Sequence, residues 1–503
     1  RKEGAIFAGV SVDFCSQMGY SREKQSRIRI LRCRKAGEGY MSTEEIYQNI
    51  IEEAESLEQE LIKLRREFHQ YPEPGWMEMR TSARIAELLE SYGCDQVLMG
   101  TEVCKADARM GVPEESLLEQ HYREVNALGQ VSEEKLKKTR GGFTGVIGIL
   151  HGKLSEERTA SEKASERASE NQVLAFRFDI DALPVTECEN MDHFPEKQGF
   201  RSICPGYMHA CGHDNHIAML LGAAKVLNAH KAEIKGNVRL LFQTAEELSK
   251  GAEIMIKDGA MDGVDAVFGQ HIGSIINKDI PAGKVIVTPG CCMASFDRFV
   301  IHVKGTGCHG STPEKGTDPI TMASHIVINL QEIIAREVSA VKAAVVTIGY
   351  FHGGVAYNAI PSEVEIEGTI RALEEPIRQY LAKRIEEIAK STAATFRGTA
   401  EVEMDWGAPP VINNDEMAAL VTEAAKEVVG EEDVVSKVPA PNMAGEDFAY
   451  YLQKVPGAFF FLSSSNPVKH TDVPHHNPHF NVDEDVLYKG SAMFVKIVED
   501  YLG

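Results

Sequence analysis

Four short segments of this sequence carry side chains of the kinds that bind metal ions. In His209-Ala210-Cys211-Gly212-His213-Asp214, the residues Cys211 and His213 stand two positions apart and can point to the same side of an extended turn. The other three segments hold Glu246-Glu247, His271 and His475-His476. Thiolate and imidazole ligands suit zinc or a neighbouring divalent metal. Two adjacent carboxylates allow one to bind the ion while the other accepts a proton from water.

The predicted strands and helices explain how these segments could meet. Residues 173–178, 238–242 and 264–268 read as apolar strands, with helices at 217–227 and 252–257. This alternation predicts a largely parallel sheet with helices on both faces. Glu246 and Glu247 directly follow one strand, and His271 is expected just past the strand ending at residue 268. Sites in open α/β sheets form at the carboxyl ends of strands, so the segments favour one metal centre. Taken alone, a Cys-x-His pair is common, Glu246-Glu247 is typical of a solvated surface pair, and the histidines at 470–479 could lie in a solvated loop.

The pattern changes at about residue 293. From there to about residue 406 the order is strand, helix, strand, strand, helix, strand, which is the split unit of ferredoxin-like domains. An α/β pattern resumes at 416–429 and 459–462. We therefore predict an α/β fold with a mostly parallel-sheet catalytic domain, residues 41–292 and 410–503. An inserted ferredoxin-like α+β lid domain, residues 293–409, interrupts it. We interpret residues 1–40 as a non-structural leader or upstream extension, and the repeats at 153–171 as a solvated loop or frayed helix.

Composition excludes several classes of partner. The chain has 503 residues and a formal net charge of -22, which disfavours nucleic acid and anionic membrane surfaces. No apolar run reaches the ~18 residues that span a bilayer. Ten cysteines without a regular framework favour reduced thiols and a cytoplasmic location. The sequence contains no Gly-x-Gly-x-x-Gly after an early strand and no phosphate-binding Gly-Lys-Ser/Thr loop, so a nucleotide-binding enzyme is disfavoured.

Five motifs together resemble the M20 metallopeptidase/amidohydrolase family, and most closely its branch of hippurate and auxin-conjugate hydrolases. They are Phe68-His69-Gln70-Tyr71-Pro72-Glu73, Phe178-Asp179-Ile180-Asp181-Ala182-Leu183-Pro184, His209 to Asp214, Phe242 to Glu247, and His476-Asn477-Pro478. The stretch Cys104 to Gly129, followed by Gly141-Gly142-Phe143-Thr144-Gly145, is similar to an insertion in the p-aminobenzoyl-glutamate hydrolase A subunit. The sequence departs from the branch at Thr244, where proline is usual, and at Asn215, where glycine is commoner.

The resemblance implies roles for particular residues. One or two divalent ions, manganese or zinc first and cobalt or nickel next, would be bound by five ligands: Cys211, His213, Glu247, His271 and His476. Glu246 would be the general base, and Asp181 would orient the metal site. In the lid, His309 would reach a neighbouring subunit's active site and stabilise the oxyanion, while Asn358 and Arg371 would hold the substrate's carboxylate. The alternatives are a loop histidine for His309, a turn cap for Asn358 and a salt bridge for Arg371.

The implied activity is hydrolysis of the amide bond in N-acyl or N-aroyl amino acids, such as p-aminobenzoyl-glutamate or hippurate. The implied assembly is a homodimer, or a heterodimer with a related subunit. Two alternatives remain open: a dipeptidase or carboxypeptidase of the same family, and a non-catalytic companion subunit with a relict site.

Overall fold

The computed structural model describes residues 52–105, 109–152, 172–436, 438 and 441–502. The predicted leader 1–40 and the repeats at 153–171 lie outside these residues. The chain divides into a unit from Arg1 to Glu53 and a unit from Ala54 to Gly503, and the latter is described below. Within the described residues, no helix has both the length and the apolar content needed to cross a membrane.

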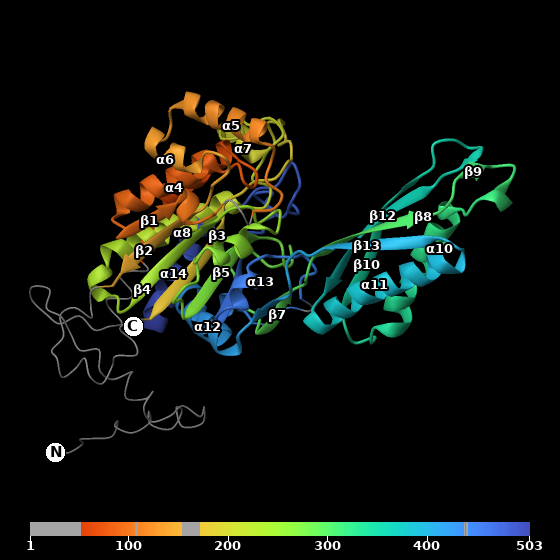
Figure 1. Cartoon of the computed structure of the whole chain (residues 1–503). Coiled ribbons are helices and arrows are strands. Elements are labelled where there is room, and N and C mark those ends of the chain that lie inside the picture. Colours follow the sequence, from red (N-terminus) through yellow and green to blue (C-terminus); the bar gives the residue numbers. More distant parts are fainter. Residues whose placement is uncertain (1–51, 106–108, 153–171, 437, 439–440, 503) are drawn as a thin grey trace, which may run out of the picture. The chain divides into compact units, whose positions relative to one another are not determined.

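An eight-stranded mixed sheet forms the centre of this unit (Figure 1). Four neighbouring strands, β4, β3, β5 and β16, run parallel to one another, while β1, β2 and β4 pair antiparallel. In sheet order the strands are β1 (Gln96–Met99), β2 (Val146–His151), β4 (Asn237–Gln243), β3 (Val173–Asp179), β5 (Ala266–Gly273), β16 (Gly457–Ser463), β6 (Val285–Ile286) and β15 (Val434–Val435). The parallel centre confirms the fold class expected from the sequence.

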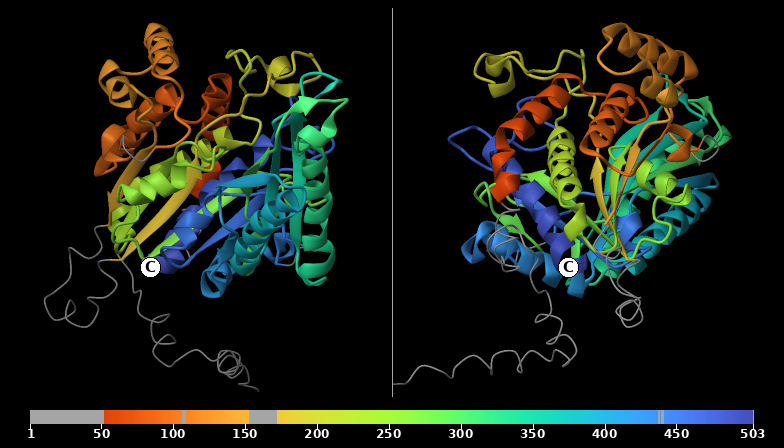
Figure 2. Two further views of the ribbon diagram at one scale, coloured as in Figure 1. Left: turned by 45° about the vertical axis from the view of Figure 1, so that its right-hand side comes forward. Right: turned by 90° about the vertical axis from the view of Figure 1, so that its left-hand side faces the viewer.

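Helices cover both faces of this sheet. The central strands are mostly apolar and almost entirely buried, as strands covered on both sides must be. On one side α8 (His213–Ala229) packs against α3 (Glu58–Gln70), α4 (Met79–Tyr92) and α14 (Leu487–Leu502) (Figures 1 and 2). On the other side α9 (Gly251–Lys257) and α13 (Ala449–Leu452) share a second core with residues of β2–β5 and β16. Helix α12 (Asp415–Val429) packs against α14 and β16.

A separate four-stranded antiparallel sheet has its own hydrophobic core. Its order is β10 (Ala344–Gly353), β12 (Glu363–Ala372), β8 (Asp297–Lys304) and β13 (Thr399–Asp405), packed with α10 (Pro319–Glu332) and α11 (Glu375–Thr395). The chain order β-α-β-β-α-β and this strand order are those of a ferredoxin-like domain, here called the lid. Two short strands that are distant in the sequence, β9 (Cys308–His309) and β11 (Ala359–Ile360), form an antiparallel pair that extends from it. The limits at residues 293 and 409 stay a prediction.

Two local features differ from the sequence expectation or extend it. Strand β5 runs to Gly273, so His271 lies inside the strand and not beyond its end; the strand continues because the parallel ladder with β16 extends to Ser463. The polar stretch at 102–140 forms α5 (Glu115–Leu128) and α6 (Glu133–Thr139).

Candidate metal centre

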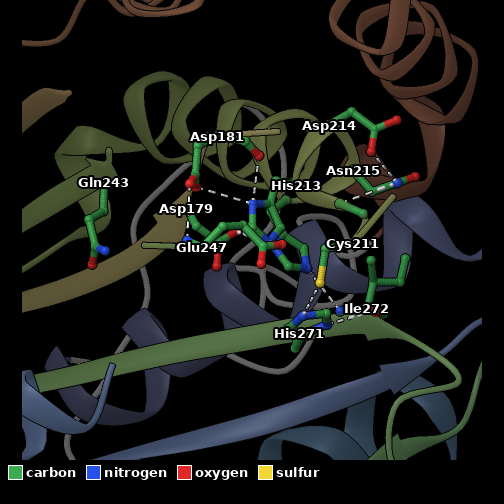
Figure 3. A network of polar contacts seen from close by, with 12 residues as sticks. Asp179, Asp181, Cys211, His213, Asp214, Asn215, Gln243, Glu247, His271 and Ile272 are labelled. Atoms are coloured by element: carbon green, nitrogen blue, oxygen red, sulfur yellow. Dashed lines mark hydrogen bonds and ion pairs between the residues drawn. The ribbon is translucent and has the colours of Figure 1, made fainter. Parts of the chain in front are cut away.

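The metal-binding residues predicted in the catalytic domain gather at one edge of the large sheet (Figure 3). The parallel strands β3, β4, β5 and β16 all have their carboxyl ends there. Asp181 follows β3, Glu246 and Glu247 follow β4, and His271 is near the end of β5. The topology therefore brings together residues that are far apart in the sequence, as the carboxyl-end rule predicts.

A glycine between Cys211 and His213 lets both side chains face the centre. Gly212 caps α8 with φ of 95°, a left-handed conformation that suits glycine. A Cβ at this position would lie 3.2 Å from Ile272 Cγ2, so the close packing also favours glycine. Cys211 consequently projects from the loop, whereas His213 is the first residue of the helix.

The potential ligand atoms form overlapping groups. Within each of three groups these atoms lie within 4.8 Å of one another: Cys211, His213 and His271; Cys211, Glu247 and His476; and His213, Glu246 and Glu247. The Cys211 sulfur is 3.5 Å from His271 Nε2, and His213 Nε2 is 3.7 Å from Glu247 Oε1. The soft and hard donors thus surround one small space.

Second partners fix the orientation of both buried imidazoles. His213 Nδ1 lies 2.8 Å from the Asp181 carbonyl oxygen, and His271 Nδ1 lies 2.7 Å from that of Ile272. Because a carbonyl oxygen only accepts, each Nδ1 must carry a hydrogen and donate it. In the neutral ring each Nε2 then presents a lone pair, which is the arrangement found at metal-binding histidines.

Two unsatisfied polar atoms show that a cation fits this space. Among the described residues, His213 Nε2 and Glu247 Oε1 are buried and have no hydrogen-bond partner. Buried polar atoms rarely lack a partner, and an ion between them would satisfy both. The donor set of thiolate, imidazole and carboxylate is one that zinc and neighbouring divalent metals accept.

His475 and His476 both contact the ligand cluster. His476 Nε2 is 3.6 Å from Glu247 Oε2, and His476 has φ of 61°. The partly buried His475 places Nδ1 3.6 Å from the Cys211 sulfur. His475 therefore packs beneath the thiol, and His476, which is half-exposed, approaches from the solvent side.

Charges in the centre shift the pKa values strongly. Although burial lowers it, the carboxylates of Asp179, Asp181 and Glu247 raise the pKa of His213 to about 10. Burial raises the pKa of Glu247 to about 8, and it raises the pKa of Cys211 well above its usual range. These directions describe a site without a cation, where protons balance the charge. A bound divalent ion would displace those protons.

Glu246 belongs to a second carboxylate cluster, with Glu446 and Asp447. Burial raises the pKa of Glu246 well above its usual range, and Glu446, Glu247 and Asp447 add to the effect. The buried Arg177 donates to Glu446 at 2.9 Å and to Asp447 at 2.5 Å. A raised pKa suits a group that takes and returns a proton near neutral pH.

Two residues that the sequence did not single out, Arg177 and His216, support the candidate ligands. Arg177 also donates to Asp179 and to Gln243, at 3.1 and 2.7 Å. His216 lies between Asp179 Oδ1 at 2.5 Å and the Ile272 N–H at 2.9 Å. The signal for Arg177 was available, since a charged residue in the middle of an apolar central strand needs buried partners.

Residues predicted in the lid lie in two separate places. His309 and Asn358 are neighbours, since His309 pairs with Ala359 and the Gly310 N–H donates to the Asn358 carbonyl at 2.8 Å. Both side chains are exposed. Arg371 is at the other end of β12, stacked 4.5 Å from the Phe296 ring centre. The structure therefore does not bring Asn358 and Arg371 together within one chain.

Arg371 has no carboxylate partner among the described residues, which disfavours a lid salt bridge as its role. The nearby Asp297 is bound by Arg378 through two hydrogen bonds of 2.6 and 2.8 Å. A Cβ on Gly445 would lie 3.7 Å from Arg371 Nη1, which places the guanidinium beside the loop that holds Glu446.

Known proteins resemble this chain along most of its length. The model of peptidase family M20/M25/M40 matches residues 175–500. N-acetyl-L-cysteine deacetylase of Bacillus subtilis (strain 168) is 35% identical over 437 residues, covering 87% of this chain and 86% of that protein. IAA-amino acid hydrolase ILR1-like 2 of Arabidopsis thaliana is 31% identical, covering 92% and 90%. The Bacillus subtilis YxeP structure, described as a dinuclear metal binding peptidase from the M20 family, has a TM-score of 0.64 at 30% identity, covering 88% of this chain and 98% of that one.

Proposed function

The chain belongs to peptidase family M20/M25/M40, and from this premise we propose that it hydrolyses the amide bond of N-acyl amino acids at the centre formed by Cys211, His213 and Glu247. One observation carries the proposal. Two histidines donate Nδ1–H to carbonyl oxygens; His271 then directs Nε2 toward the Cys211 thiol, and His213 directs Nε2 toward the Glu247 carboxylate. That arrangement suits metal binding, because without an ion the buried His213 Nε2 and Glu247 Oε1 would lack partners among the described residues.

The ligands proposed are Cys211, His213, Glu247, His271 and His476. Five donors exceed the four that a single tetrahedral zinc ion uses, which supports two ions, as does the dinuclear relative. A divalent ion at this place supplies Lewis-acid chemistry. Asp181 holds the site in shape, since its carbonyl accepts from His213 and its Oδ2 accepts from the Glu247 N–H at 3.0 Å.

Glu246 is proposed as the general base. It is mostly buried, lies beside the ligand Glu247, and faces Glu446 and Asp447. It would take the proton from the attacking water and return it to the leaving amine, while His309 stabilises the negative charge that develops on the carbonyl oxygen. The intact donor set argues against a companion subunit with a relict site.

The substrate's carboxylate has one candidate partner beside the metal centre. Arg371 is next to the 445–448 loop and is free of carboxylate partners among the described residues. Its planar guanidinium can bind a carboxylate with two parallel hydrogen bonds. We therefore propose that the amino-acid half of the substrate lies toward Arg371.

His309 and Asn358 require a second copy of the chain to take part. Residues 363 to 371 of β12 separate the β9–β11 tip from Arg371. A strand rises about 3.3 Å per residue, so the two ends are roughly 25 Å apart. One small substrate cannot contact both ends in one chain. In a dimer the tip of one copy would complete the site of the other, and we propose that assembly, with a related subunit as the alternative partner.

The acyl group is proposed from the relatives and from the insertion. The relatives are named for N-acetyl-L-cysteine and IAA-amino acid substrates, which are both acylated amino acids. Helices α5 and α6 form the insertion that resembles the p-aminobenzoyl-glutamate hydrolase A subunit, so that substrate belongs in the test. The cysteines of the described residues are free, which supports the proposed cytoplasmic location.

The decisive experiment compares substrates on enzyme reconstituted with manganese, zinc or cobalt. The panel contains p-aminobenzoyl-glutamate, hippurate, N-acetyl-cysteine, an indolyl-acyl amino acid and a dipeptide. Turnover of an acylated amino acid is expected, and Glu246→Gln should lower kcat by about 10²–10⁴-fold with metal content unchanged. No turnover of any member by the metal-loaded protein would refute the proposed function. A dipeptide preferred over every acylated amino acid would favour the peptidase alternative.

Subunit complementation tests the role of the lid tip. His309→Ala and Glu246→Gln chains are each expected to be inactive alone. When the two are coexpressed, half of the dimers are mixed and each contains one intact site, so about a quarter of the wild-type activity should return. A mixture that stays inactive would show that His309 does not act on the neighbouring site.

A further inference from the structure

A buried acid outside the metal centre contacts the turn that carries Glu246 and Glu247. Glu78 directly precedes α4, has no exposed surface and accepts the backbone N–H of Ala245 at 2.8 Å. Ala245 has φ of 50°, a left-handed conformation that is unfavourable for a residue with a side chain. The hydrogen bond to Glu78 therefore holds a strained residue immediately before Glu246.

Three oxygen contacts join Glu78 to two buried threonines. Thr144 Oγ1 is 2.7 Å from Glu78 Oε2, Thr244 Oγ1 is 2.6 Å from Glu78 Oε1, and the two hydroxyl oxygens are 2.7 Å apart. All three distances are those of O–H···O hydrogen bonds. Each contact therefore needs one hydrogen between its oxygens.

Counting hydrogens decides the protonation state. Each threonine hydroxyl has a single hydrogen, and an ionised carboxylate has none. With Glu78 ionised, one of the three contacts would place two oxygens at 2.7 Å without a hydrogen between them. With Glu78 protonated, the ring closes: the acid donates to one threonine, that threonine to the other, and the second threonine back to the acid.

We propose that Glu78 is a neutral carboxylic acid that closes a hydrogen-bonded ring with Thr144 and Thr244 and so positions the turn bearing Glu246 and Glu247. It is a positioning residue, since its contact with the turn runs through Ala245 and Thr244. Thr244, which stands where its family branch usually has proline, contributes its hydroxyl group to this ring.

The surroundings of Glu78 agree with the neutral state. Burial and the neighbouring Asp181 carboxylate raise the pKa of Glu78 to about 8. The buried thiol of Cys104 also interacts electrostatically with Glu78. Gly75 lies against the same turn, since a Cβ there would be 3.1 Å from Ala245 Cα. The turn at Ala245 therefore packs against Gly75, and the neutral acid Glu78 accepts its backbone N–H.

Glutamine at position 78 distinguishes a neutral acid from a carboxylate. Its amide can donate to Thr144 and its oxygen can accept from Thr244 and Ala245, so the ring survives in Glu78→Gln. Methionine has no hydrogen to donate to Thr144 and only a weak thioether acceptor for Thr244 and Ala245, so Glu78→Met opens the ring, as does Thr244→Val. We expect kcat of Glu78→Gln within about threefold of wild type, and kcat of the other two reduced at least tenfold with little change in KM, since small displacements of catalytic groups are costly.

A matched control uses Glu73, a buried acid in the same segment. Its oxygens accept the Arg80 and Thr81 N–H groups at 3.0 and 2.8 Å and face His121 at 2.8 Å. The amide of Glu73→Gln must point at a backbone N–H, so this variant should have a lower urea midpoint, whereas Glu78→Gln should not.

Infrared spectroscopy of the metal-loaded protein at pH 7 gives a reading that needs no substrate. Wild type should show a protonated carboxylic acid band that Glu78→Gln removes, and Thr244→Val should shift it. Absence of that band, or a Glu78→Gln variant as impaired as Glu78→Met, would overturn the proposal. Because infrared and urea measurements use no substrate, they remain informative if the proposed hydrolase activity fails.

Discussion

Replacing Arg177 with methionine should strongly destabilise the catalytic domain. Arg177 is 1% exposed and donates to Asp179, Gln243, Glu446 and Asp447. Methionine fills much of the volume but supplies neither the charge nor the donors. Three buried carboxyl groups then lose their cation.

The expected loss follows from the cost of unpaired buried charge. Removing one partner of a buried ion pair typically costs about 3–5 kcal/mol, and we expect about 4 kcal/mol at pH 7. The carboxyl groups of the variant can escape part of this cost by binding protons. Their folded-state pKa values would then be raised, so this relief is present at low pH and is lost as pH rises. As pH falls, the difference in unfolding free energy between wild type and the variant should therefore narrow by about 1.4 kcal/mol per pH unit for each extra proton that the folded variant binds.

Urea unfolding followed by tryptophan fluorescence measures this difference. Trp76 is fully buried in the same unit, and a Trp406→Phe background makes it the reporting residue. Arg123→Met is the control, because Arg123 is 75% exposed beside Glu119 and such pairs contribute about 0–1 kcal/mol. An Arg177→Met variant no less stable than this control, or a gap that widens toward low pH, would refute the reasoning.

Three further outcomes follow from the same contacts. Cys211→Ala should lose metal measured by mass spectrometry, and unchanged metal content would remove the thiol from the ligand set. Chelation should lower the urea midpoint of wild type but not of Cys211→Ala, because an ion bound only to the folded state stabilises it. Although burial raises it, contacts with His69, His193 and the Ser202 N–H hold the pKa of Glu187 well below its usual range. Its contribution is present above about pH 4.3 and lost as pH falls further, so the urea midpoint of wild type should drop more steeply from pH 6 to 3 than that of Glu187→Gln.

The sheet and the lid could be predicted because their signals are local. Apolar runs such as Phe459 to Leu462 are strands covered on both faces, and the β-α-β-β-α-β order specifies a ferredoxin-like unit. The end of β5 was predicted too early, at residue 268. Gln270 and His271 break the apolar run, yet both are buried because β16 pairs with them. The pairing of β5 with the distant strand β16 sets the end of β5, and this pairing cannot be seen in the local hydrophobic pattern.

The candidate ligand side chains and the orienting Asp181 could be predicted from residue type and motif, whereas the backbone atoms that hold them could not. Glu246, Glu247 and His271 come together because the carboxyl ends of the parallel strands β4 and β5 lie at one edge of the sheet, where loops also bring Cys211, His213 and His476. The supports depend on which backbone atoms face a side chain. The carbonyls that orient His213 and His271 are invisible in a sequence, and so are the N–H groups held by Glu78 and Asp181.

The charge balance of the centre explains why these supports are necessary. Six carboxyl groups converge there: Asp179, Asp181, Glu246, Glu247, Glu446 and Asp447. Arg177 and a protonated His213 supply two positive charges, which cannot compensate all six. Without a divalent ion the remaining charge is reduced by proton uptake, as the raised pKa values of Glu247 and Asp447, each about 8, indicate. A neutral Glu78 at the neighbouring turn keeps a seventh negative charge out of this region. The same arrangement that makes the site electrostatically costly without a cation therefore makes it selective for one.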